Sequence, residues 1–330
     1  CGISGIFGVN SPDSITDMVR CVSHRGPDGS GHYIDHMDNG TISMGHSRLA
    51  IMDISGSSQP MISDHGRVLI QNGEIYNSDK IRDSITGFNW TTSGDSEVIL
   101  ALHDRHIGRV TSQPTSADGR LLNGMRISGS ATTYGNPAEK HIPWVSRLDG
   151  IWGFALWDPS IRELILCRDP LGVKPLIRHI LDDGTMIFGS EIKSFYGHPD
   201  FTPLPDMEAL AIRLAYEYPL DRTTLFRGVT NVGQGTIETW GVDSLGHAVL
   251  TGIANYCINQ FNPSPIGENL NHSRLLLDSL RDGVAERMES DAPLGLVLSG
   301  GIDSSLVAAI AKEHSDSSSR DSPECWTIGG

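Results

Sequence analysis

The chain has 330 residues and a net charge of −15, with 40 acidic against 25 basic residues. This length allows two domains, and the acidic balance argues against a nucleic-acid-binding surface or an anionic-membrane surface. No apolar run approaches the ~18 residues of a membrane span. The five cysteines are scattered, without a Cys-x-x-Cys pair, which argues against a zinc ribbon or disulfide scaffold and favours a reducing, cytoplasmic location.

The chain begins Cys1-Gly2-Ile3-Ser4-Gly5-Ile6-Phe7-Gly8, and residues 1–9 are expected to form a strand. A terminal cysteine carries a free α-amine and a thiol on one residue. The amine, with an ordinary pKa near ~8, can act as a base that activates the thiol as a nucleophile. The small residues Cys1 and Gly2 are compatible with removal of an initiator methionine before Cys1. The ordinary alternative, a chain that merely happens to begin with cysteine, stays open on this stretch alone.

The following segments predict an α+β domain of several strands and few helices. Apolar residues at 15, 18, 19 and 22 indicate one helix face, and a second helix is expected from Asp95 to about His106. Strands are expected at 44–52, 67–71, 151–157, 163–168 and 185–190. The Asn72-Gly73 pair suggests a hairpin turn after the second of these strands. Residues 108–146 lose all periodicity, and we interpret them as an insertion.

The second half predicts a helix after Asp206, a mostly irregular connector with β character over 219–262, and an amphipathic helix over 276–288. A short apolar strand at 294–298, a glycine turn, a helix at 306–314 and a strand at 326–328 then follow. This order is the start of a parallel α/β sheet. We place the boundaries at 1–205 for the first domain, 206–270 for the connector and 271–330 for the second domain.

The glycine turn Ser299-Gly300-Gly301-Ile302-Asp303-Ser304-Ser305 is a candidate pyrophosphate site. Its glycines allow backbone N–H groups to point at an anion, and the positive end of the following helix lies there. Asp303 suits a Mg²⁺ ion that bridges phosphates. No lysine follows the glycines, so this is not the common P-loop. The alternative is an ordinary strand-to-helix turn with a capping serine.

Polar residues of the first domain suggest a ligand for Cys1. Asn72 and Gly73 offer a side-chain amide and a backbone N–H to an oxyanion. Arg48 offers a planar fork to an α-carboxylate, and Glu74 with Asp95 can hold an ammonium group. Each is more often structural when taken alone. His24 and Arg25 are expected to stabilise their turn, and a role in the site stays open as the alternative. Together the set suits an α-amino acid whose side-chain carbonyl Cys1 attacks.

The chain resembles a known family at this point. The segments Cys-Gly-Ile-Ser-Gly-Ile-Phe, His-Arg-Gly-Pro-Asp, His-Ser-Arg-Leu-Ala-Ile, Asn-Gly-Glu-Ile-Tyr-Asn and Ser-Gly-Asp-Ser-Glu-Val-Ile resemble class II glutamine amidotransferase domains. Those are N-terminal-nucleophile hydrolases with an α/β/β/α sandwich. With Arg-Asp-Pro-Leu-Gly-Val-Lys-Pro-Leu, Gly-Ser-Glu-Ile-Lys-Ser and the glycine turn, the resemblance narrows to glutamine-hydrolysing asparagine synthetases, whose second domain is a parallel-sheet ATP-pyrophosphatase.

The resemblance implies roles for individual residues. Cys1 would be the nucleophile, with Asn72 and Gly73 as its oxyanion hole. The glutamine-binding residues would be Arg48, Leu49, Ala50, Ile51, Met52, Asn72, Gly73, Glu74 and Asp95. ATP would be held by Val297, Ser299, Gly300, Gly301, Asp303, Ser304 and Ile328, with Mg²⁺ at Asp303. The family activates aspartate with ATP, and ammonia from glutamine reaches it through a tunnel that excludes water. Such enzymes often form homodimers, so a homodimer is expected.

Two departures from the family limit these expectations. Residues 108–146 replace a much shorter connection, as a surface insertion or a translated intron. The chain also stops at Gly330, just past the second strand of the synthetase sheet, so the chain alone is expected to hydrolyse glutamine at best. Three alternatives are an amidotransferase for another carboxylate, a β-lactam-forming synthetase, against which Cys1 argues, and a non-catalytic remnant.

Overall fold

The computed structural model describes residues 1–9, 13–112, 135–218, 221–257, 271–318 and 323–327. The chain divides into two compact units. The first comprises Cys1–Leu49 and Ser57–Ile258, and the second comprises Ala50–Gly56 and Asn259–Gly330. Among the helices in the described ranges, none is long and apolar enough to cross a membrane.

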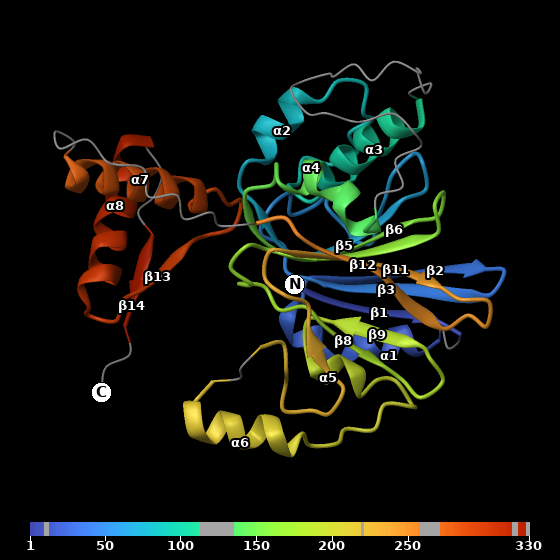
Figure 1. Ribbon diagram of the computed structural model, residues 1–330. Coiled ribbons are helices and arrows are strands. Elements are labelled where there is room, and N and C mark those ends of the chain that lie inside the picture. Colours follow the sequence, from blue (N-terminus) through green and yellow to red (C-terminus); the bar gives the residue numbers. More distant parts are fainter. Residues whose placement is uncertain (10–12, 113–134, 219–220, 258–270, 319–322, 328–330) are drawn as a thin grey trace. The chain divides into compact units, whose positions relative to one another are not determined.

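The first unit is a four-layer sandwich in which two antiparallel sheets face each other and helices cover both outer faces (Figure 1). One sheet has the strand order β10-β8-β9-β1-β3-β2, with bounds Thr230–Asn231, Ile177–Ile180, Met186–Gly189, Gly2–Gly8, Gly40–Arg48 and Gly29–Met37. The other has the order β12-β11-β7-β6-β5-β4, with bounds Ala248–Asn255, Thr236–Val242, Glu163–Arg168, Gly150–Asp158, Val68–Ile75 and Met61–Ile62. This is the α/β/β/α arrangement that the family resemblance implies.

Alternation along the strands produces the layers, because successive side chains point to opposite faces. Ile3 and Phe7 of β1 belong to the core between the sheets, whereas Ile6 packs in the core beneath the helices on the outer face. The helices of the first sheet are α1 (Ser14–Cys21) and α5 (Ile192–Phe195), with the 3₁₀ turn η1 (Ser23–Arg25) after α1. Those of the second sheet are α2 (Ser78–Ser84), α3 (Glu97–Ser112), η2 (Pro137–His141) and α4 (Ile142–Val145).

The region 206–270, which the sequence analysis treats as a connector after a first domain ending at 205, contributes β10, β11 and β12 to the two sheets. Before them lies the predicted helix, α6 (Met207–Tyr216). The hydrophobic pattern expected of a strand is interrupted in β11 by Glu238. This residue is fully buried and accepts a hydrogen bond from Arg178 Nε at 2.6 Å. A buried carboxylate can be tolerated when it is paired. The first compact unit therefore continues past 205, to Ile258.

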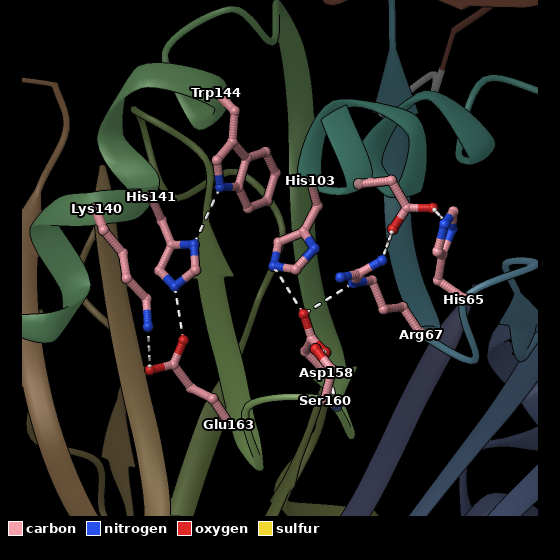
Figure 2. A network of polar contacts seen from close by, with 10 residues as sticks. His65, Arg67, His103, Lys140, His141, Trp144, Asp158, Ser160 and Glu163 are labelled. Atoms are coloured by element: carbon pink, nitrogen blue, oxygen red, sulfur yellow. Dashed lines mark hydrogen bonds and ion pairs between the residues drawn. The ribbon is translucent and has the colours of Figure 1, made fainter. Parts of the chain in front are cut away.

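The predicted insertion at 108–146 includes residues at both of its ends that belong to the fold. Helix α3 runs on to Ser112, and Ala138, Trp144 and Val145 are buried in the core on the outer face of the second sheet. Figure 2 shows how this return segment is fixed. His141 Nε2 donates to Glu163 Oε1 at 2.7 Å, and Trp144 Nε1 donates to His141 Nδ1 at 3.1 Å. The rest of the predicted insertion, 113–134, lies outside the described residues.

Several strand predictions also need correction. The expected strand 44–52 corresponds to β3, which begins at Gly40, ends at Arg48 and pairs along its length with β2. Neither β2 nor β8 is among the predicted strands. Asn72-Gly73 is not a turn, because β5 continues through it and pairs Asn72 with Gly153 of β6. The long antiparallel pairing with β6 overrides the local turn preference of the Asn-Gly pair.

The second unit contains α7 (His272–Arg287), β13 (Gly295–Val297), α8 (Ile302–Ser318) and β14 (Glu324–Trp326). β13 and β14 pair in parallel, with Gly295 opposite Glu324 and Val297 opposite Trp326. This confirms the predicted strand, glycine loop, helix and strand order. The helix begins at Ile302 rather than 306, so Asp303 and Ser304 lie in its first turn.

Candidate active site

Cys1 precedes β1, which lies between β3 and β9 in the first sheet. Its Sγ accepts a hydrogen bond from Leu49 N at 3.4 Å and lies 3.5 Å from Leu49 O. Its carbonyl oxygen accepts Arg25 Nε at 2.9 Å. The thiol is therefore held against the residue after β3 and remains partly exposed, as a nucleophile that meets a substrate must be.

The α-amine of Cys1 is poised to act as a base. The pKa of this amine is lowered from 8.0 to about 6, first by burial and then by the nearby charges of Arg25 and Lys174, against the opposing effects of Glu74 and Asp28. At pH 7 a pKa of about 6 leaves roughly nine-tenths of the amine unprotonated. The amine can therefore accept the thiol proton within one residue.

Glu191 holds the turn beside Cys1. Its two carboxylate oxygens bind Arg25 NH1 at 2.6 Å and His24 Nε2 at 3.1 Å. Partial burial raises the pKa of Glu191, but the Arg25 guanidinium and, to a smaller extent, His24 outweigh this effect and hold the pKa below its usual value. Arg25 thus does more than stabilise its own turn, because it also binds the Cys1 carbonyl.

Asn72 and Gly73 lie in β5, the strand of the second sheet that contacts β1. Asn72 is 1% exposed and its Nδ2 donates to Ser190 Oγ at 3.4 Å. Gly73 has a φ of 156°, and a Cβ there would lie 2.1 Å from the backbone oxygen of Ile151. Only glycine fits at 73, so the backbone path that presents the Asn72 amide depends on it.

Glu74 and Asp95 form a pair of interacting carboxyl groups. Burial raises the pKa of both, and the charge of Asp95 raises that of Glu74 further. Asp95 Oδ2 accepts Ile75 N at 2.7 Å, and that bond favours the ionised form of Asp95. The pair therefore holds a proton at neutral pH, mainly on Glu74, until a cation compensates it.

Lys174 is a site residue that the sequence analysis does not assign, although the motif that contains it is quoted there. Asp169 is buried, and its carboxylate accepts the N–H groups of Val173 and Lys174, each at 2.9 Å. Its Oδ2 also accepts Trp152 N at 3.3 Å, and Trp152 pairs with Gly73. This loop thereby brings the Lys174 charge to Glu74 and the Cys1 amine, where it lowers the pKa of each.

The end of β3 brings two further side chains to the space between the sheets. His46 is fully buried, and burial lowers its pKa to about 3, so it is neutral. Its Nε2 donates to Gln71 O at 3.0 Å, which fixes the peptide that precedes Asn72. Arg48, two residues further along the strand, lies on the same face. This places the predicted carboxylate fork on the side of β3 that faces the second sheet.

The remaining predicted residues belong to the second unit. Ala50, Ile51 and Met52 are grouped there, so their part in glutamine binding stays a prediction, whereas Leu49 contacts the Cys1 thiol. Gly300 has a φ of +79°, a left-handed conformation that favours glycine. Ser304 Oγ lies 3.0 Å from Ser299 Oγ and donates to Gly301 O at 3.2 Å. These bonds close the loop between β13 and α8 on itself.

The structure describes all the residues predicted to bind the nucleotide and the metal except Ile328. Val297 is exposed at the end of β13, and Ile328 lies outside the described residues. The first N–H groups of α8 have no partner within the helix, as at any helix start. With the glycine at 300, the loop is chemically suited to an anion. No group of three or more His, Cys, Asp and Glu within the described ranges is arranged to hold a metal ion. Asp303 would need phosphate oxygens as further ligands.

Comparison with known proteins matches this site to one class. Residues 1–114 and 139–247 match the family described as the glutamine amidotransferase domain, and the chain belongs to that family. Residues 275–329 match the asparagine synthase family. The gap in the first match, 115–138, falls within the segment that the sequence analysis interprets as an insertion.

Named relatives point the same way. The chain is 32% identical to the putative glutamine-hydrolysing asparagine synthetase of Mycobacterium tuberculosis, over 95% of this chain and 44% of that protein. It is 29% identical to the glutamine-hydrolysing asparagine synthetase 1 of Bacillus subtilis, with the same coverage. The chain thus spans less than half the length of these relatives. A solved structure described as the allosteric regulatory enzyme of purine biosynthesis has a TM-score of 0.51 at 16% identity, covers 95% of this chain and 63% of its own, and shares the fold.

Proposed function

We propose that the first unit hydrolyses glutamine at Cys1 and that the ammonia released serves asparagine synthesis from aspartate. The observation that carries the proposal is that Cys1, with its low-pKa amine, directly precedes β1, and that Asn72 lies in β5, a strand of the opposite sheet that contacts β1. The family match and the names of the relatives support the same substrate. The Glu74–Asp95 pair adds a site for an ammonium group, which a free amino acid carries.

The proposed reaction has two stages. The Cys1 amine takes the thiol proton, and the thiolate attacks the side-chain carbonyl carbon of glutamine while Asn72 Nδ2 and Gly73 N stabilise the oxyanion. The amine returns its proton to the leaving nitrogen, so ammonia departs and a thioester remains on Cys1. Water then attacks the thioester, which releases glutamate and restores the thiol.

The second unit is proposed to bind ATP at the loop Ser299–Ser304, with Val297 and Ile328 as further predicted contacts. ATP, when bound with Mg²⁺, supplies the activating group for the aspartate side-chain carboxylate. The backbone N–H groups of the loop and the first turn of α8 would hold its phosphates, and Asp303 would contribute one carboxylate ligand to Mg²⁺. Because the chain spans less than half of its relatives, the complete synthesis is proposed for the enzyme of which these residues form part.

The test begins with the ammonia source. The purified chain is incubated with glutamine, and glutamate and ammonia are measured, with equal amounts expected. Aspartate and ATP are then added and asparagine is measured. Glutamate without asparagine would restrict this chain to the glutaminase step, and the absence of glutamate release would contradict the proposal.

Glutamine binding is expected to release about one proton at pH 7. Burial and mutual repulsion raise the pKa of Glu74, so the Glu74–Asp95 pair is partly protonated in the free enzyme. The ammonium of glutamine would favour the ionised form and lower that pKa, so the proton leaves. Calorimetry in two buffers with different ionisation enthalpies measures the release. Glu74→Gln should abolish it, and a binding heat that is the same in both buffers would contradict the pair as the ammonium site.

A further inference from the structure

Ser190 links the nucleophile strand to the end of β9. It is 2% exposed. Its backbone N–H donates to Ile3 O at 2.9 Å, and its hydroxyl oxygen accepts Ile3 N at 3.1 Å. The backbone N–H and the carbonyl oxygen of Ile3 therefore both bind Ser190, and Ile3 is only two residues from Cys1.

The same hydroxyl oxygen reaches the opposite sheet. It accepts Asn72 Nδ2 at 3.4 Å, across 118 positions of sequence. One oxygen thus joins β1, which carries the nucleophile, to β5, which carries the side-chain amide of the proposed oxyanion hole. A carboxamide has two N–H donors. Ser190 takes one of them and leaves the other for the substrate.

We propose that Ser190 is a positioning residue that fixes the Asn72 amide relative to Cys1. The inference rests on the proposed glutaminase function. Oxyanion donors accelerate a reaction when they are already aimed at the position where charge develops. The Asn72 side chain can rotate unless one N–H is held, and Ser190 holds it from the strand that also positions the nucleophile.

The hydroxyl has this role apart from packing. The Ser190 N–H to Ile3 O bond does not need the side chain, so Ser190→Ala keeps that link between β1 and the end of β9. The variant loses only the oxygen that Ile3 N and Asn72 share. A neighbouring buried serine offers a matched control: Ser194 donates its hydroxyl to Glu191 O at 2.8 Å and makes no bond to Asn72.

The test measures glutamine hydrolysis by the full chain. Ser190→Ala is expected to lower kcat by roughly 10- to 100-fold, a part of the ~10²–10³-fold effect of deleting an oxyanion donor. KM for glutamine should not change, because the groups that hold its carboxylate and amine are intact. Ser194→Ala should keep the parent kcat. Alkylation of Cys1 by iodoacetamide, which forms no oxyanion, should proceed at the parent rate in both variants.

A double-mutant cycle separates positioning from stability. In an Asn72→Ala background, Ser190→Ala should have no further effect on kcat, because the group it positions is gone. Independent, multiplicative effects, or a parent kcat for Ser190→Ala, would overturn the inference. Ser190→Thr keeps the hydroxyl and should retain kcat, so an equal loss in both variants would also overturn it. A parent kcat for Asn72→Ala would instead overturn the oxyanion assignment itself.

Discussion

Replacing Cys1 by alanine is expected to lower kcat for glutamine hydrolysis by more than about 1,000-fold, the scale at which a covalent nucleophile acts. Glutamine should still bind, because Arg48, Glu74 and Asp95 remain. Glutamate release measures the first expectation, and calorimetry with glutamine measures the second. Residual hydrolysis close to the parent rate would show that another group attacks the substrate.

A chain with one glycine placed before Cys1 tests the amine separately from the thiol. The thiol is still present, yet the base becomes an amide nitrogen that cannot accept a proton. Hydrolysis should fall nearly as far as in Cys1→Ala, while the thiol still reacts with iodoacetamide. An unchanged rate would mean that a base other than the Cys1 amine activates the thiol.

The pH dependence of the parent chain follows from the same amine. Its pKa is lowered to about 6, and only the unprotonated form accepts the thiol proton. At saturating glutamine, where the substrate ammonium already keeps the Glu74–Asp95 pair ionised, kcat should therefore fall as pH drops through about 6, rather than through the value of 8.0 for an ordinary terminal amine. A midpoint near 8 would show that the site does not lower the pKa of the amine.

The sequence predicts the residues of the site only where they lie within short, distinctive motifs. Cys1, Asn72 and Gly73 are chemically unusual in their setting, and the structure places Cys1 directly before β1 and Asn72 in β5, a strand of the facing sheet. The local part of the prediction was wrong where pairing with a distant strand decides the conformation. Asn72-Gly73 has the composition of a turn, yet both residues pair with β6 as part of β5. The residues adjacent in sequence do not indicate this pairing.

Residues that act through distant contacts could not be found in this way. Ser190 lies 118 positions from Asn72, and Glu238 lies 60 positions from Arg178. A lone serine and a glutamate within a polar strand have no pattern of their own. The motif Gly-Ser-Glu-Ile-Lys-Ser drew attention to the region of Ser190, but only the topology shows which atoms it joins.

A buried charge network on the outer face of the second sheet is expected to dominate the stability of the first unit (Figure 2). Asp158 is fully buried, and its Oδ2 accepts Arg67 Nε at 2.8 Å. Its Oδ1 accepts Ser160 N at 2.9 Å and Ser160 Oγ at 2.6 Å. Arg67 also binds Asp104 Oδ1 at 2.7 Å, so it lies between two carboxylates in a site that water barely reaches.

Asp158→Ala should reduce the free energy of unfolding by about 3–5 kcal/mol, because it leaves a buried guanidinium without half of its charge compensation. Urea unfolding measures the loss. The matched control is Asp38→Ala, whose partner Arg162 forms a 2.7 Å ion pair with both side chains largely exposed; it should change stability by less than about 1 kcal/mol. Equal losses in the two variants would mean that burial of the Arg67 network contributes nothing.

The folded fraction of Asp158→Ala should hydrolyse glutamine at the parent kcat. Asp158 ends β6, whereas the residues of that strand opposite Asn72 and Gly73 are Gly153 and Trp152, near its other end. A protein that loses stability here therefore keeps the geometry of the site until it unfolds. A fall in kcat under conditions where the chain is fully folded would instead show that the network on the outer face of the sheet helps to position β5.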